Sequence, residues 1–306
     1  MPYDLSEPLV IGISSRALFN LEEENRIFEE NGLEAYEKYQ VEHEEMILQK
    51  GPAFQLVKAF LGLNRLQPDK RLVEVIIMSR NSPNTSLRIF NSVRDYEMDI
   101  TRAALSGGAS ISPYLKAFKT DLFLSAHPED VKSAIDNDIA AGMILPGSPY
   151  TDPRSKIEQI RIAFDGDAVL FAAESERIYQ HKGMKAFMDN ESEKANIPLP
   201  KGPFANFLDT LAHIQNLFRD KPSVPIRTAL VTSRNAPAHE RAIKTLRSWG
   251  IRVDEAFFLG GVSKKEVLSA FGAHIFFDDQ RIHTDPASEV VPSAVVPYRE
   301  GDDPRL

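Results

Sequence analysis

The sequence contains no cysteine, which excludes disulfides, thiolate metal sites and cysteine nucleophiles. It also lacks an apolar run near the roughly 20 residues that a membrane-spanning helix needs. The start, Met1-Pro2-Tyr3-Asp4, has neither the basic nor the apolar region of a secretory signal. From these absences we expect a cytoplasmic protein without membrane contact.

An excess of basic residues is missing as well. Lysine and arginine number 36 against 44 aspartates and glutamates, for a formal net charge of −8. A nucleic-acid-binding protein usually carries a basic surface, so we expect no nucleic-acid partner. The 306 residues, of which 42% are apolar, are enough for one large domain or two ordinary ones.

The chain resembles itself at a long period. Residues 13–36 share six identical residues with 164–187 at an offset of 151, among them Gly32 and Gly183. Residues 79–83 match 233–237, and a third block starts at Gly107 and Gly260. Three blocks in one order predict an internal duplication with halves 1–150 and 151–306, joined near 146–156. The alternative is that two α/β layers share a generic composition.

Each half alternates short apolar runs with helical patterns. The expected strands are 9–13, 72–78, 100–104, 121–124 and 143–145 in the first half, and 160–164, 228–232, 255–259, 274–277 and 294–296 in the second. In the second half the expected helices are 175–188, 204–218, 238–249 and 264–271. Nearly continuous apolar strands are typical of sheets buried on both faces. We therefore predict an α/β fold with a doubly wound parallel sheet, whose ligands bind outside the carboxyl ends of the strands.

Acidic residues follow two of these strands. Asp165 and Asp167 come directly after 160–164, and Asp278 and Asp279 follow the apolar run that ends at Phe277. Carboxylates gathered in one crevice repel each other unless a cation neutralises them. Oxygen ligands in an open site favour Mg²⁺, which also binds substrate phosphate. The alternatives are a structural metal site or acids that merely cap the strand ends.

Phosphoryl chemistry suits this arrangement. A carboxylate can attack phosphorus, and a second acid two residues further on can exchange protons with the leaving alcohol and with water. Thr232, at a strand end, and Lys264, at a helix start, can bind phosphate oxygens. Ser233 and Arg234 can add phosphate or ribose contacts. Arg234 can equally pair with a carboxylate of the crevice.

The order DxD, hhhT, Lys and FFDD resembles the haloacid dehalogenase-like (HAD) phosphatase superfamily. The resemblance implies that Asp165 is the nucleophile and Asp167 the general acid and base, and that Thr232 and Lys264 bind phosphate. It also implies that Mg²⁺ is held by Asp165, Asp278 and the main-chain carbonyl of Asp167, with Asp279 in support. The resemblance thus implies one catalytic set of six residues: Asp165, Asp167, Thr232, Lys264, Asp278 and Asp279.

Longer segments resemble the cytosolic 5′-nucleotidase type I family. They include AFDGDAVLFAAESERIYQHKGMKAF, TLRSWGIRVDEAFFLGG and HIFFDDQRIH in the second half and VIGISSRALFNLEEENRIF in the first. The resemblance implies hydrolysis of nucleoside 5′-monophosphates, with AMP, IMP and deoxynucleotides as candidates. Two alternatives stay open: a HAD phosphatase for another small phosphomonoester, and a nucleotide-sensing protein with incidental hydrolysis. The sequence leaves the oligomeric state open, including a homo-oligomer.

An insertion at about 172–225 separates the first two strands of the second half. In the HAD superfamily such an insertion is a cap, and here we expect a small helical one that excludes water and contacts the base. Four phenylalanines are candidates for stacking on the base or, alternatively, for the core: Phe171, Phe187, Phe204 and Phe207.

The first half lacks the chemistry of the second. The internal alignment places Ser14, Arg16, Met78, Ile111, Ser125 and Ala126 where the second half has Asp165, Asp167, Thr232, Lys264, Asp278 and Asp279. We interpret residues 1–150 as a degenerate HAD-like half without catalytic residues. One hypothesis is that it is only a scaffold. The other is that it binds a nucleotide effector, with Arg16, Ser79 and Arg80 holding an anion.

Overall fold

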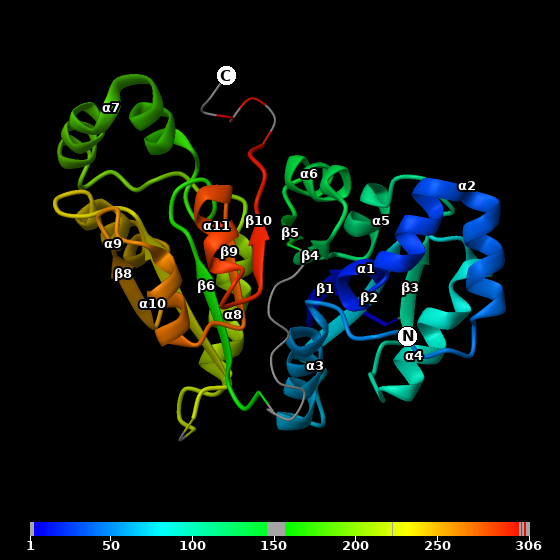
Figure 1. The fold of residues 1–306 in the computed structure, drawn as a ribbon. Coiled ribbons are helices and arrows are strands. Elements are labelled where there is room, and N and C mark those ends of the chain that lie inside the picture. The colour runs from blue at the N-terminus through cyan, green and yellow to red at the C-terminus, as the bar shows by residue number, and fades with distance from the viewer. Residues whose placement is uncertain (1–2, 146–156, 222, 300, 302, 304–306) are drawn as a thin grey trace.

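The computed structural model describes residues 3–145, 157–221, 223–299, 301 and 303. The expected linker at 146–156 lies outside these residues. Ten strands form one sheet: β1 (Leu9–Ile13), β2 (Val73–Ser79), β3 (Arg102–Leu105), β4 (Leu122–Ser125), β5 (Ala140–Ile144), β6 (Ile160–Phe164), β7 (Ile226–Thr232), β8 (Glu255–Phe258), β9 (Ile275–Asp278) and β10 (Ser293–Val295). Figure 1 shows helices on both faces of this sheet. In the described part of the chain, no helix has the length and apolar character to cross a membrane.

The helices of the first half are α1 (Ser15–Leu18), α2 (Glu22–Glu42), α3 (Phe54–Gly62), α4 (Leu87–Asp95), α5 (Ser112–Ala117) and α6 (Pro128–Asp136), with short 3₁₀ turns at Leu63–Leu66 and Pro83–Thr85. Those of the second half are α7 (Glu174–Glu193), α8 (Ala205–Leu217), α9 (His239–Ser248), α10 (Lys264–Phe271) and α11 (Arg281–Ala287). Most predicted elements lie within two residues of these bounds. The helix α11 was not predicted, and it contains Pro286, a residue that usually argues against a helix interior.

The strand order is β3-β2-β1-β4-β5-β10-β9-β6-β7-β8. Read from either outer edge inward, the two halves therefore have the same order. All pairs within a half are parallel, as predicted, but β5 and β10 are antiparallel, with Ala294 opposite Ile144. The expectation of a fully parallel sheet is wrong at this pair. The two halves meet through strands at equivalent places in the strand order, and these two strands run in opposite directions.

This antiparallel pair, which we call the seam, reverses the direction of one half relative to the other. The carboxyl ends of β1–β4 and of β6–β9 therefore lie at opposite edges of the sheet. The chain after β10 runs beside the residues that precede β5, where Arg299 forms an ion pair with Asp138 at 3.1 Å. In each half a ligand crevice is therefore expected at the carboxyl ends of that half's own strands.

Several backbone features occur at matching places in the two halves. Both α2 and α7 are interrupted by a glycine with positive φ, Gly32 at 83° and Gly183 at 79°. The turns after β3 and β8 contain the pairs Gly107-Gly108 and Gly260-Gly261, with φ values of 58° and 91° in both pairs. A glycine is needed there because other residues rarely adopt positive φ.

The second helix of the predicted insertion belongs to the core. The ring of Phe204, next to α8, lies 4.6 Å from that of Phe277, and Phe207 lies 6.2 Å from Phe164. Phe171 lies in the same core, whereas Phe187, on α7, is buried outside it, so the core interpretation holds for Phe171, Phe204 and Phe207. Of the two described helices in the predicted insertion, α7 is the one that stands away from the sheet, beyond the carboxyl ends of β6 and β9 (Figure 1).

The seam leaves little room for side chains, which gives a stability test. A Cβ on Gly142 would lie 2.8 Å from Cβ of Ala294 and 2.9 Å from Cε1 of Phe277. We expect Gly142→Ala to lower the free energy of unfolding by about 1–3 kcal/mol, because the joining strands must move apart. Urea unfolding followed by circular dichroism measures this loss.

The matched control is Gly62→Ala, at the end of α3. Its φ is −60° and nothing lies within 4 Å of an added Cβ, so we expect a change within about 1 kcal/mol, if anything stabilising. Equal stability of Gly142→Ala and the unaltered protein would contradict a tightly packed seam.

Candidate functional site

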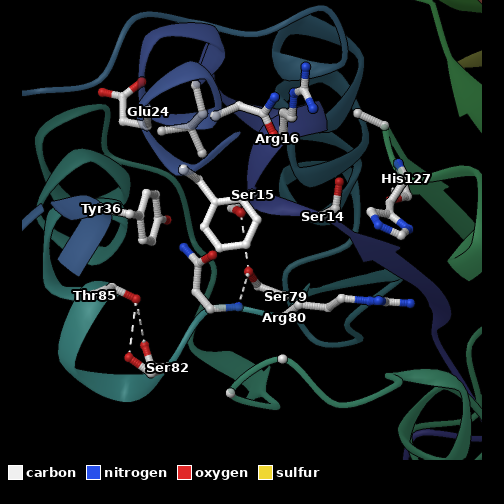
Figure 2. A pocket seen from close by; sticks show the side chains of 18 of the residues that line it. Ser14, Ser15, Arg16, Glu24, Tyr36, Ser79, Arg80, Ser82, Thr85 and His127 are labelled. Atoms are coloured by element: carbon white, nitrogen blue, oxygen red, sulfur yellow. Dashed lines mark hydrogen bonds between the residues drawn. The ribbon is translucent and has the colours of Figure 1, made fainter. Parts of the chain in front are cut away.

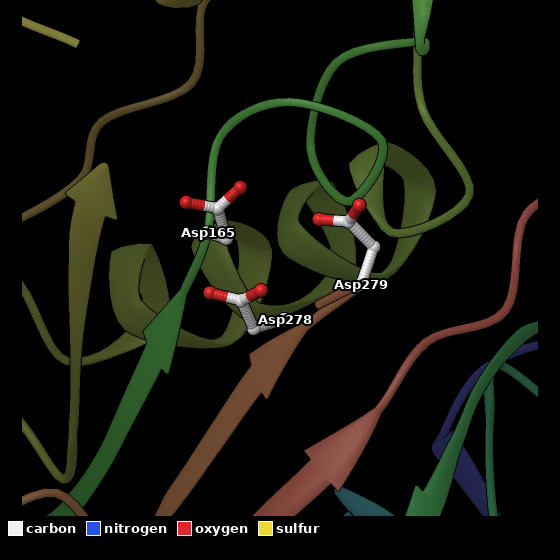
Figure 3. A group of neighbouring side chains, drawn as sticks. All are labelled: Asp165, Asp278 and Asp279. Carbon is white, nitrogen blue, oxygen red and sulfur yellow. The ribbon is translucent and has the colours of Figure 1, made fainter. Parts of the chain in front are cut away.

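The pairing of β6 with β9 brings three carboxylates together. Phe164 lies opposite Phe277, and the Asp165 N–H donates to the carbonyl of Phe277 at 2.8 Å. Asp165 and Asp278 therefore leave the sheet side by side. One carboxylate oxygen each from Asp165, Asp278 and Asp279 lies within 4.8 Å of the others, and all three residues are buried (Figure 3). The predicted gathering of acids from two strand ends is confirmed for these three.

Lys264 supplies a positive charge in this group. The helix α10 begins at this residue, after Ser263 whose hydroxyl accepts the N–H of Lys265 at 3.3 Å. The Lys264 ammonium donates to Asp165 and, at 2.6 Å, to Asp278. Burial alone would lower the pKa of Lys264, but the two carboxylates raise it above its ordinary value. The lysine therefore stays charged.

The carboxylates remain only partly neutralised. Burial raises the pKa of Asp165 to about 6, against the opposing effect of Lys264. Burial, followed by the charges of Asp278 and Asp165, raises the pKa of Asp279 well above its usual range. Such shifts mark carboxylates that lack enough positive charge nearby.

The donor set fits a hard divalent cation. Three buried carboxylates offer the oxygen ligands that Mg²⁺ and similar ions bind. Oδ2 of Asp279 accepts a hydrogen bond from the hydroxyl of Tyr298, whereas its buried Oδ1 has no hydrogen-bond partner within the described residues. A buried acceptor without a donor is costly, and a cation would satisfy it. The group could therefore hold a metal ion.

Asp167 is not part of this carboxylate group and pairs with Arg234. Nε and Nη2 of Arg234 donate to the two Asp167 oxygens at 2.8 and 2.6 Å. Arg234, which is 3% exposed, also pairs with Glu191 on α7, and Glu191 accepts from Arg241 at 2.9 Å. Of the two roles considered for Arg234, the carboxylate pairing is the one that the structure contains. This chain of four charges links the crevice to α7.

Thr232 and Ser233, the other predicted phosphate ligands, lie at the end of β7, where Thr232 is next to the loop that follows β6. Thr232 ends β7, and its hydroxyl accepts the N–H of Arg234 at 3.2 Å. A Cβ on Gly166 would lie 3.2 Å from this hydroxyl, so the loop after β6 passes directly beside Thr232. Ser233 follows at an exposed position. The phosphate contacts of Thr232, Ser233 and Lys264 stay predictions.

Sequence reasoning missed four polar residues of this region: Glu176, Glu191, Arg241 and Tyr298. Burial raises the pKa of Glu176, in the first turn of α7, and Asp167 and Asp165 add to the increase. Arg241 lies 153 residues after Arg88, which is the offset of the third repeated block, and both arginines are buried. Tyr298 gave none, since only the turn after β10 brings it to Asp279.

The buried lysine can be tested against its exposed neighbour. In EDTA we expect Lys264→Met to lower the free energy of unfolding by about 3–5 kcal/mol, because it leaves buried carboxylates without their counter-charge. We expect Lys265→Met to change it by about 1 kcal/mol or less, since Lys265 pairs with the exposed Glu289. Adding Mg²⁺ should recover part of the Lys264→Met loss, as measured by thermal unfolding. Equal losses in the two variants would argue against a buried charge cluster.

Comparison with known proteins identifies relatives of this chain. A family model described as 5′-nucleotidase matches residues 1–303. The human protein named cytosolic 5′-nucleotidase 1B is 40% identical over 294 residues, which are 92% of this chain and 47% of that protein. The chain thus spans about half the length of this relative. A solved structure, histidinol dehydrogenase from Elizabethkingia anophelis, matches 94% of this chain and 52% of its own at 10% identity, with a TM-score of 0.24. From the family match and the human relative, the chain belongs to the 5′-nucleotidase family.

Proposed function

We propose that this protein is a Mg²⁺-dependent 5′-nucleotidase that hydrolyses nucleoside 5′-monophosphates through an aspartyl-phosphate at Asp165. AMP, IMP and deoxynucleoside monophosphates are the candidate substrates. The observation that carries the proposal is the buried group of Asp165, Asp278 and Asp279 beside Lys264, in a chain that belongs to the 5′-nucleotidase family.

The first step forms a bond between a carboxylate oxygen of Asp165 and phosphorus and breaks the bond from phosphorus to the 5′ oxygen. Asp167 first releases one oxygen from Arg234 and takes up a proton from solvent there; it then gives this proton to the leaving oxygen, so that the nucleoside departs neutral. In the second step water attacks phosphorus, Asp167 takes the water proton, and the phosphate leaves Asp165. Arg234 holds both Asp167 oxygens, so its role here is to position this acid, and one hydrogen bond must open for each proton transfer.

The metal would be held by Asp165, Asp278 and Asp279, together with the main-chain carbonyl of Asp167. When bound, Mg²⁺ would neutralise the carboxylates and the charge of the transferring phosphoryl group. Lys264 touches both Asp165 and Asp278, which suits a residue that keeps the nucleophile and the phosphate together. Thr232 and Ser233 are proposed to bind phosphate oxygens at the end of β7.

The helix α7 is proposed as the cap, within an insertion at about 172–225. It carries an edge-to-face aromatic pair, Tyr179 and Phe187, with ring centroids 6.4 Å apart. Tyr179 is 40% exposed and therefore available to a base. The charge chain from Asp167 through Arg234 to Glu191 gives the cap a direct connection to the catalytic acid.

We further propose that the protein is an internally duplicated HAD-like chain, with halves 1–150 and 151–306. Shared strand order supports this, and so does a repeated buried ion pair. In the first half Arg88 on α4 pairs with Glu24 on α2 at 2.6 Å, and in the second Arg241 on α9 pairs with Glu191 on α7 at 2.9 Å. The arginines lie 153 residues apart, which is the offset of the third repeated block, whereas the glutamates come from opposite ends of the kinked helices.

The location, an effector, the oligomeric state and the substrate class are separate proposals. The human relative is named cytosolic, and we propose the same location for this chain. A nucleotide effector and a homo-oligomer stay hypotheses. A phosphatase for another small phosphomonoester is the competing proposal, since the carboxylate group would serve any phosphomonoester.

A substrate panel separates these proposals. Purine and pyrimidine ribo- and deoxyribonucleoside monophosphates are compared with sugar phosphates, in Mg²⁺ and in EDTA, by phosphate release. We expect preferential nucleotide hydrolysis that EDTA abolishes. Asp165→Asn should remove turnover without loss of folding, while the control Asp209→Asn, at an exposed position on α8, should leave it unchanged. Full turnover by Asp165→Asn would refute the nucleophile.

The role of Asp167 can be tested with a better leaving group. We expect Asp167→Asn to lower the single-turnover rate constant for a nucleoside monophosphate by about 10²–10⁴-fold, the usual contribution of a general acid. The loss should be much smaller for p-nitrophenyl phosphate, whose leaving group needs no proton. The measurement is the ratio of the two losses under single-turnover conditions, which report the first step. Equal losses would mean that Asp167 acts only by holding the site together.

A further inference from the structure

A second cavity lies in the first half, at the position that corresponds to the acidic crevice of the second. Its volume is about 420 Å³, within the roughly 300–1,000 Å³ usual for small-molecule sites. It opens at the carboxyl ends of β1, β2 and β4, and α2 covers it as α7 covers the acidic crevice. We call it the first-half pocket, and its lining includes Ser14, Tyr36, Met78, Ser79, Arg80 and Ser125.

One end of this pocket corresponds to the proposed phosphate site of the second half, but it lacks the residues that are proposed to bind metal and phosphate there. Ser14 and Ser125 stand where the second half has Asp165 and Asp278, so no carboxylate pair is present for a metal. Met78 replaces Thr232 and Ile111 replaces Lys264, and both are buried apolar side chains. A phosphate group placed there would meet neither a metal site nor a buried lysine, and only neutral serine hydroxyls would replace its water.

The arginines of the pocket are already neutralised. Arg80 donates from Nη2 to Asp130 at 2.6 Å and from Nε at 3.0 Å. Arg16 donates to both oxygens of Glu22 at 2.8 and 2.7 Å. Glu37 lines the pocket too, and the described residues include no ion pair for it. The hypothesis that Arg16, Ser79 and Arg80 hold an anion therefore lacks an uncommitted arginine.

The rest of the crevice is retained. In Figure 2 the hydroxyls of Ser14, Ser15 and Ser79 gather in the middle, with Tyr36 on one side and His127 on the other. The helix α2 carries an edge-to-face pair, Phe28 and Tyr36, with centroids 6.0 Å apart and planes at 82°. This pair corresponds in the alignment to Tyr179 and Phe187 of α7, whose planes meet at 77°.

From this contrast we infer that the first-half pocket binds an uncharged nucleoside. This inference rests on the proposed function, because it takes the nucleoside to be the part of the substrate that the retained features would recognise. The base packs against Phe28 and Tyr36 under the kinked helix. The sugar hydroxyls exchange hydrogen bonds with the serine hydroxyls and with Glu37. The protein would thereby bind its own reaction product at a site without chemistry.

Isothermal titration of adenosine and inosine into the full chain tests the inference. We expect saturable binding that Phe28→Ala weakens by about tenfold or more, the usual effect of removing an aromatic ring from a base. Phe28 is 48% exposed, so its replacement should leave the fold intact, which a thermal melt checks. The matched control is Tyr179→Ala, which removes the corresponding ring over the other crevice and should leave this binding event unchanged.

Two results would overturn the inference. The first is that neither nucleoside shows a binding event that depends on Phe28. The second is that inorganic phosphate binds and Arg80→Met removes that binding, which would make the pocket an anion site. Failure of the proposed function is seen separately, because the titration measures binding alone whereas the substrate panel measures turnover alone.

Discussion

The structure depends on placing three buried carboxylates next to each other. Asp165, Asp278 and Asp279 are fixed by the backbone, since the first two continue neighbouring parallel strands. Lys264 supplies one positive charge, but burial and the neighbouring carboxylates still raise the pKa of Asp165 and of Asp279. The surrounding elements serve this arrangement: α10 begins at the lysine, and the turn after β10 brings Tyr298 to Asp279.

A second set of charges connects the crevice to α7. Asp167 is not part of the group of three carboxylates, and Arg234 binds both its oxygens. Arg234 is held in turn by Glu191, which Arg241 and Ser175 also contact. Burial alone would raise the pKa of Glu191, but Arg234 lowers it, so the pair stays ionised. The position of the acid is therefore tied to the position of the kinked helix.

The sequence predicted the features that depend on local pattern. Apolar runs located the strands to within a few residues, and the acids at the ends of β6 and β9 identified the carboxylate group. It did not predict the seam, because strand direction across the junction depends on contacts between residues far apart, such as Ala294 and Ile144. It also left the role of Arg234 open, since only the folded turn shows which carboxylate the guanidinium reaches. Tyr298 was missed for the same reason.

The opposed directions of the two halves have a thermodynamic consequence. The two crevices open at different edges of one sheet, so two ligands can be bound at once without touching. An influence of one on the other can pass through the packed sheet, including the two residue pairs of β5 and β10, and through the contact of α3 with β6. Such an influence would be a coupling free energy, and it would be reciprocal: each ligand would change the affinity for the other by the same factor.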